Sequence, residues 1–344
     1  MASRLPPLLE IERFSSEDAG PAVKTGMWTL VAVSGLFLAL RLGAKKKKRH
    51  VGALDNDHDH DDGDDGSSST PDKQLRRPSL YWDDWVLVGA WAALLANGVF
   101  THAAVELGYG RHARDVDPRA LPSLAVAGLL SSTFSFAGQA LGKTGLALAL
   151  LRFTRRGGRV RAFVLVNIVL VNVLFAIGAV LFWVQCVPLE KLWRPSLAGG
   201  RCMDPRINVV YGIIVGGYSG IIDLILSALP WKVLKDVQID QQEKIAVILT
   251  MNLGIFAGIA AFIKCSYVPT LIYGDFSYTG AQLVIWGAAE TAVVIMATSV
   301  PIMRPLLRDA ASSMRRKMSP KKPQQQLWAL PPDQKGEGTT FPTR

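Results

Sequence analysis

The chain has 344 residues, 49% of them hydrophobic, a mean hydropathy of +0.23 and a formal net charge of +10. Its apolar residues come in blocks long enough to cross a hydrocarbon layer of about 30 Å, which excludes an ordinary soluble domain. The blocks are apolar all round, so they predict helices rather than the alternating strands of a transmembrane barrel. The excess positive charge is explained by membrane topology, and no nucleic-acid partner is predicted.

Seven blocks predict an all-α membrane protein with a seven-transmembrane-helix bundle. In chain order they are Met27–Leu42, Trp85–Val105, Leu121–Leu151, Phe163–Val187, Ile207–Leu229, Ile245–Ile263 and Leu283–Met303. The first block is short, but Lys24 and Arg41 can extend its reach by snorkelling. Lysines rather than a cleavage site follow it, so we interpret it as a true span and not as a signal peptide.

The distribution of basic residues predicts the direction of the chain. With the N-terminus outside, the cytoplasmic segments 41–84, 152–162, 230–244 and 304–322 carry 24 Lys and Arg residues, whereas the outside segments carry 11. This asymmetry follows the positive-inside rule, so we expect a cytoplasmic C-terminus. The plasma membrane is the expected location of this multi-pass protein.

Polar stretches flank and interrupt the membrane domain, which we predict at 27–309. Residues 1–26 form a polar extracellular leader, and 310–344 form a disordered basic cytoplasmic tail. Residues 45–80 are predicted to be a disordered charged loop, because they lack apolar periodicity. Besides the lipid bilayer itself, anionic lipid is an expected partner of the basic start of this loop. That basic start comprises Lys45, Lys46, Lys47, Lys48 and Arg49.

An acidic, histidine-containing run from Asp55 to Asp62 raises the question of a metal site. It fails as a calcium loop, because Asp62 stands where glycine is needed and Ser68 where glutamate is needed. A solvated spacer is the favoured interpretation, with weak exchangeable metal binding as the alternative. We therefore predict no metal site.

Two cysteines bracket the loop between the fourth and fifth spans. Cys186 and Cys202 lie on the predicted outer side, where an oxidising compartment permits a disulfide, and two free thiols are the alternative. A bridge that closes a loop of this length contributes about 3 kcal/mol. Cys265 has no evident partner.

Charged side chains at membrane depth are costly and therefore mark functional candidates. Lys143 and Asp223 lie about 9 and 8 residues from the cytoplasmic ends of their spans, so they share one depth. We predict an intramembrane ion pair, either a helix–helix staple or a bistable switch. Glu290 lies near the midplane with no evident cation at its level, and is the first ligand- or proton-sensing candidate. His102 and Glu106, at the outer end of the second span, are further ligand-binding candidates.

Several catalytic motifs are missing. The sequence contains no phosphate-cradling glycine loop outside a span, no HExxH and no GxSxG. We therefore predict no catalytic residue, no cofactor and no enzymatic activity.

A series of residues follows a recognisable order along the spans and the outer loop. It runs Asp83-Asp84-Trp85; Lys143 before Leu151-Arg152; Gln185-Cys186-Val187-Pro188; Trp193; Gly200-Arg201-Cys202-Met203-Asp204; Asp223; Leu229-Pro230; Lys244; Trp286; Glu290; Pro301; and Arg304-Pro305-Leu306. In this order the residues resemble the fungal rhodopsin-like domain family. That family includes seven-helix proteins related to the Pth-type G-protein-coupled-receptor-like proteins and a membrane protein of the satratoxin biosynthetic cluster.

The resemblance covers roughly residues 27–309 and implies a seven-helix bundle with a Cys186–Cys202 bridge, but it supplies no ligand. The cysteine-rich extracellular domain of some receptor-like members has no counterpart in residues 1–26. Retinal binding requires a mid-span lysine in the last helix, and Leu283–Met303 contains none. Photoreception is therefore not predicted.

The sequence favours a receptor-like protein that senses a small extracellular ligand, with a heterotrimeric G protein as a candidate cytoplasmic partner. One alternative is a membrane component, scaffold or enzyme, of a secondary-metabolite biosynthetic pathway. The other is a proton-coupled transporter, although no inverted repeat is evident.

Overall fold

A computed structural model of the chain describes residues 19–58, 82–111, 116–153, 158–194, 197, 199–234, 241–273 and 276–318. Helices account for most of it. They are α1 (Gly20–His58), α2 (Trp82–Glu106), α3 (Leu121–Phe153), α4 (Arg159–Trp183), α5 (Pro205–Leu234), α6 (Gln241–Tyr267), the short α7 (Thr270–Tyr273) and α8 (Phe276–Met318). Two short strands, β1 (Cys186–Val187) and β2 (Arg201–Cys202), flank the 3-10 helix η4 (Leu189–Leu192).

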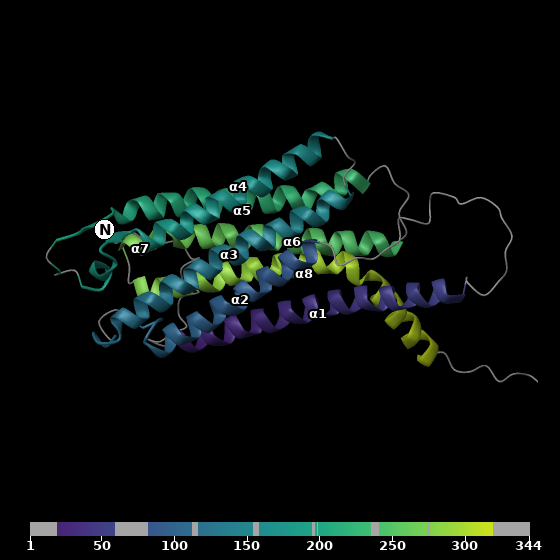
Figure 1. The fold of residues 1–344 in the computed structure, drawn as a ribbon, viewed down its shortest axis with the longest axis horizontal. Helices are drawn as coiled ribbons and strands as arrows, with labels where there is room; N and C mark the ends of the chain where they lie inside the picture. The colour runs from purple at the N-terminus through teal and green to yellow at the C-terminus, as the bar shows by residue number, and fades with distance from the viewer. Residues whose placement is uncertain are drawn as a thin grey trace, which may run out of the picture. The chain divides into compact units, whose positions relative to one another are not determined.

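Seven of these helices are long and apolar enough to cross a membrane, and they run alongside one another as a bundle (Figure 1). This confirms the predicted seven-helix fold. The short first block is part of a 27-residue candidate span, Gly20–Lys46, so this helix is long enough to cross the membrane. The direction of the chain across the membrane stays a prediction.

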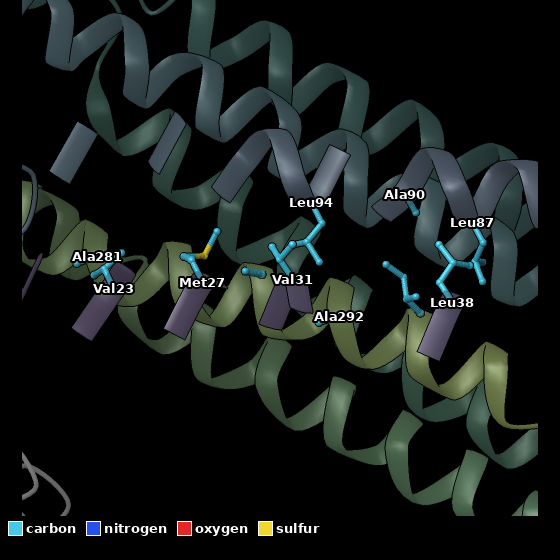
Figure 2. Close-up of a cluster of buried hydrophobic side chains, with 11 residues drawn as sticks. Val23, Met27, Val31, Leu38, Leu87, Ala90, Leu94, Ala281 and Ala292 are labelled. Atoms are coloured by element: carbon cyan, nitrogen blue, oxygen red, sulfur yellow. The ribbon is translucent and has the colours of Figure 1, made fainter. Parts of the chain in front are cut away.

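One apolar cluster joins α1, α2 and α8 (Figure 2). Figure 2 shows Val23, Met27 and Val31 of α1 pointing towards the neighbouring helices. These residues are four apart in the sequence, so they lie on the same face of α1. α2 contributes Leu87 and Leu94, whereas the buried residues of α8 in this cluster are mostly alanines. Small side chains let membrane helices approach closely, so the packing of α8 depends on its alanine-rich face.

Glycines bring α5 and α6 together. A Cβ atom added to Gly258 would lie 2.9 Å from Leu224 Cδ2 and 3.2 Å from the carbonyl oxygen of Gly220. Any side chain at Gly258 would therefore push the two helices apart.

Two helices extend beyond their predicted ends. α1 remains helical to His58, whereas residues 45–58 were predicted to belong to a disordered loop; residues 59–80 lie outside the described part. The physical reason is that extending a helix already formed by a membrane span costs little, and lysine and arginine are good helix formers. α8 likewise continues to Met318, so the predicted tail is helical over 310–318, and 319–344 are not described.

The predicted disulfide between Cys186 and Cys202 is confirmed. These two residues face each other in the antiparallel pair of β1 and β2, and the backbone N–H of Met203 donates to the carbonyl of Gln185 at 2.7 Å. Inside the loop, Lys191 Nζ donates to the carbonyl oxygens of Gly199 and Gly200 at 3.0 and 2.9 Å. Cys186–Cys202, here called the bridged loop, is thus held by covalent and hydrogen bonds together.

Candidate functional site

Four charged side chains from four helices meet inside the bundle, and we call them the charge network. Lys143 of α3 places its Nζ atom 2.6 Å from Asp223 Oδ2 of α5 and 2.9 Å from Glu290 Oε1 of α8. Lys264 of α6 places its Nζ atom 2.6 Å from Glu290 Oε2. The charges therefore alternate in a chain, Lys264, Glu290, Lys143 and Asp223, that is electrically neutral when all four are ionised.

Burial differs along the charge network. The side chains of Lys143, Asp223 and Glu290 are 2%, 1% and 0% exposed, whereas that of Lys264 is 15% exposed. In so dry a place each charge depends on its partners, because an isolated ion in hydrocarbon is strongly unfavourable. Lys264 is the member through which the charge network reaches the protein surface.

The two carboxylates are not equally satisfied. Glu290 receives hydrogen bonds from Lys264 and, at 2.7 Å, from Ser219 Oγ, in addition to its contact with Lys143. Asp223 Oδ2 accepts from Lys143, but its second oxygen, Oδ1, is buried and has no hydrogen-bond partner among the described residues. Both carboxylate oxygens of Glu290 are therefore hydrogen-bonded or paired with a lysine, whereas only one oxygen of Asp223 has a partner among the described residues.

Neutral side chains extend the charge network towards α3. Lys264 Nζ donates to Gln139 Oε1 at 2.6 Å, and Gln139 Nε2 donates to the hydroxyl of Ser135 at 3.2 Å and to its carbonyl at 3.3 Å. A Cβ atom at Gly287 of α8 would lie 3.3 Å from Ser135 Oγ and 3.9 Å from Lys264 Cδ. These polar groups thus converge where α8 has no side chain.

The structure brings together the predicted pair Lys143 and Asp223, but it corrects the expectation for Glu290. That residue was expected to have no cation at its level, and it contacts two lysines. Lys264 was missed because it directly follows the apolar block Ile245–Ile263 and was assigned to the outer segment. Helical spacing is a usable signal, since Lys264 lies on one face with the fully buried Ala257 and Ala261.

A second buried cluster joins α1, α2 and α8. The Arg41 guanidinium donates from Nη2 to Asp83 Oδ2 at 2.7 Å, from Nε to Asp84 Oδ1 at 3.0 Å, and from Nη1 to the carbonyl of Thr298. Lys45 also pairs with Asp84. Arg41 was expected to snorkel to the membrane surface; it is instead fully buried, because two carboxylates at the start of α2 offer it better partners.

His102 and Glu106 lie apart from the charge network. Glu106 pairs with Lys24 of α1 and lies 3.7 Å from His102 Nε2, while the indole of Trp28 donates to His102 Nδ1 at 3.4 Å. The side chains of Glu106, His102 and Lys24 are 62%, 44% and 29% exposed. The three ligand-binding candidates therefore fall into an exposed group, His102 with Glu106, and the buried Glu290.

The described part of the chain contains no group of three or more His, Cys, Asp or Glu side chains placed to hold a metal ion. Residues 59–62 of the acidic run Asp55–Asp62 lie outside the described part, and the side chains of residues 55–58 are not described.

Comparison with known proteins gives a family and several relatives. The fungal rhodopsin domain matches residues 72–309. A satratoxin biosynthesis cluster protein of Stachybotrys chartarum is 27% identical over 122 residues, which cover 36% of this chain and 42% of the relative. A polyenoic acids biosynthesis gene cluster protein of Metarhizium anisopliae is 24% identical over 250 residues, covering 65% and 64%. A fugralins biosynthesis cluster protein of Gibberella zeae is 26% identical over 129 residues, covering 36% and 31%.

The chain spans less than two thirds of the length of each of these relatives. The family match itself begins ahead of α2 and ends within α8, so it takes in six of the seven spans, both cysteines of the bridged loop and all four members of the charge network. The chain belongs to the fungal rhodopsin domain family.

Proposed function

We propose that this chain is a receptor-like membrane protein whose conformational switch is the charge network. The observation that carries the proposal is the position of Lys143, which lies within 3 Å of carboxylates on two different helices, Asp223 of α5 and Glu290 of α8. A lysine ammonium is a point charge on a flexible stem, so it can favour either carboxylate. Movement of α5 relative to α8 would shift Lys143 from one partner to the other, which makes the charge network a two-state element.

A ligand acts on such a switch only if it binds one state more tightly than the other. In the proposed topology the bridged loop and Lys264 face the outside, and the small ligand enters from there. The basic segments of the opposite side, in the plasma membrane, face the cytoplasm and a heterotrimeric G protein. In this proposal the chain is not an enzyme.

Distances between helices test whether the charge network switches. Nitroxide labels are placed on Val210→Cys of α5 and Gln282→Cys of α8, both exposed, in a Cys265→Ser background in nanodiscs. Asp223→Asn removes one of the two partners of Lys143 and is expected to change the distance distribution, as is Lys143→Met. Lys24→Met, which breaks an exposed pair, is the control. One distribution shared by all variants would show a rigid staple and contradict the switch.

Signalling is tested separately. Wild-type protein in nanodiscs is mixed with a fungal G-protein α-subunit, and the rate of nucleotide exchange is compared with that for Glu290→Gln. We expect acceleration by the wild type and a changed level for the variant. If neither protein alters exchange, the receptor assignment is lost.

A second candidate is a membrane component of a secondary-metabolite biosynthetic pathway. It is favoured by the names of the three relatives, each described as a biosynthesis cluster protein. Gene deletion followed by metabolite profiling separates the candidates. A pathway component predicts accumulation of one intermediate in all growth conditions, whereas a receptor predicts that the whole pathway changes with an external signal.

A further inference from the structure

We propose that Lys264 docks the carboxylate of an apolar carboxylic acid, and that one proton enters with the acid and is taken up by Asp223. The inference rests on the proposed function, because it names the ligand class of the same charge network.

The member of the charge network that a ligand can reach determines the sign of the charge that the ligand carries. Lys264 is the partly exposed member, whereas both carboxylates are buried. Its ammonium has three N–H donors, and two of them are used by Gln139 Oε1 and Glu290 Oε2. A third donor remains for an acceptor from outside. Because the accessible group, Lys264, is a cation, we expect the ligand group that binds it to be an anion.

The depth of Lys264 in the membrane limits which class of anionic ligand can reach it. Its Nζ atom lies 2.6 Å from Glu290 Oε2, and Glu290 is ten residues from the end of its span at Gly280, which corresponds to about 15 Å along α8. A phospholipid phosphate stays at the surface of the hydrocarbon layer, so it is too shallow for this position. A carboxylic acid with its own apolar chain can insert to this depth.

A hydrogen-bond donor for the second carboxylate oxygen is close by. The Ser135 hydroxyl accepts from Gln139 Nε2 and keeps its own hydrogen to donate, and it lies with Lys264 beside Gly287, where a Cβ atom would be within 4 Å of both side chains. Together they form a site for an oxyacid rather than for a simple apolar molecule.

Charge balance then requires a proton. The charge network holds two cations and two anions, so an added carboxylate leaves one uncompensated negative charge in a dry place. Asp223 Oδ1, which is buried and has no hydrogen-bond partner in the part of the chain that the structure describes, can be protonated without breaking a hydrogen bond. The charged groups that face Asp223 are Lys143 of α3, Glu290 of α8 and Lys264 of α6.

The two events lead to one rearrangement. When Lys264 turns to the ligand, Glu290 loses one cation and draws Lys143 towards itself. A protonated Asp223 no longer attracts Lys143, so the tie between α3 and α5 is released. Acid binding and proton uptake are thus linked through the lysine that the two carboxylates share.

The binding experiment uses cis-parinaric acid, a fluorescent polyene fatty acid, with wild-type protein in nanodiscs. Lys264→Met is expected to raise its Kd by about tenfold or more, which is the effect of losing a hydrogen bond to a charged group. Lys264→Arg keeps the positive charge and is expected to retain binding. If it does, the weaker binding of Lys264→Met is not caused by misfolding. Lys24→Met is the control and is expected to leave Kd unchanged, because Lys24 also has a carboxylate partner on another helix but lies outside the charge network. The methyl ester of the probe, which lacks the charge, binds wild type and Lys264→Met alike. Equal acid affinity of wild type and Lys264→Met overturns the site.

Proton uptake is measured with a pH-indicator dye in weak buffer, after subtraction of the signal from empty nanodiscs. We expect about one proton per bound acid for wild type and none for Asp223→Asn. Acid binding without uptake in the wild type overturns the role of Asp223. A helix-distance change in Asp223→Asn together with absent acid binding would refute this inference and leave the proposed switch standing.

Discussion

Two buried cations in this protein differ in how many arrangements they permit. Arg41 uses three nitrogens of a planar guanidinium, each with its own acceptor, so a single orientation satisfies it. Lys143 has one nitrogen and two carboxylates within reach. Arg41 therefore fixes the positions of α1, α2 and α8, whereas Lys143 leaves α5 and α8 able to exchange partners.

Removal of Arg41 tests its fixing role. Arg41→Met leaves Asp83 and Asp84 buried with fewer partners, and breaking a buried pair in this way costs about 3–5 kcal/mol. The thermal unfolding midpoint in detergent is expected to fall clearly. Lys24→Met serves as the control, because exposed ion pairs contribute little. Equal midpoints for the two variants would show that the Arg41 cluster does not stabilise the fold.

At the scale of elements, α5 and α6 are the pair whose contact depends most on glycine. Both carry members of the charge network, Asp223 and Lys264, so their spacing determines how far these charges lie from Lys143 and Glu290. A change in helix spacing is thus expected to alter the switch as well as the stability.

Gly258→Leu tests this contact. Its side chain meets Leu224 and the backbone of Gly220 at once, and overpacking of this kind costs about 1–3 kcal/mol. Gly217→Leu, on α5 with open space around its Cβ position, is the matched control. We expect the thermal unfolding midpoint to fall more for Gly258→Leu than for Gly217→Leu. An equal decrease for both variants would argue against a close approach of α5 and α6.

For the whole molecule, the sequence was enough to predict the seven spans and the disulfide, because block length and cysteine position are local properties. The depth argument also paired Lys143 with Asp223. The second half of the charge network was missed, because Lys264 directly follows an apolar block and depth along the chain does not say which way a side chain turns. Only helix packing shows that it turns inward, towards Glu290.

The direction of the bundle is open to a direct experiment. The charge distribution predicts that the N-terminus and the bridged loop lie outside and that residues after Met303 lie in the cytoplasm. Epitope tags at the two ends of the chain in intact cells are expected to bind antibody at the N-terminus only. A tag detected at the C-terminus without permeabilisation would reverse the topology and move Lys264 to the cytoplasmic half.

The distribution of the charge network over α3, α5, α6 and α8 has a consequence for biogenesis. The ribosome delivers these helices one after another, and no helix neutralises its own charge. Lys143 finds Asp223 once α5 is inserted, but Lys264 lacks its carboxylate until α8 arrives. An unfinished chain thus carries a costly positive charge within the bilayer. The insertion of α8, which carries Glu290, neutralises that charge.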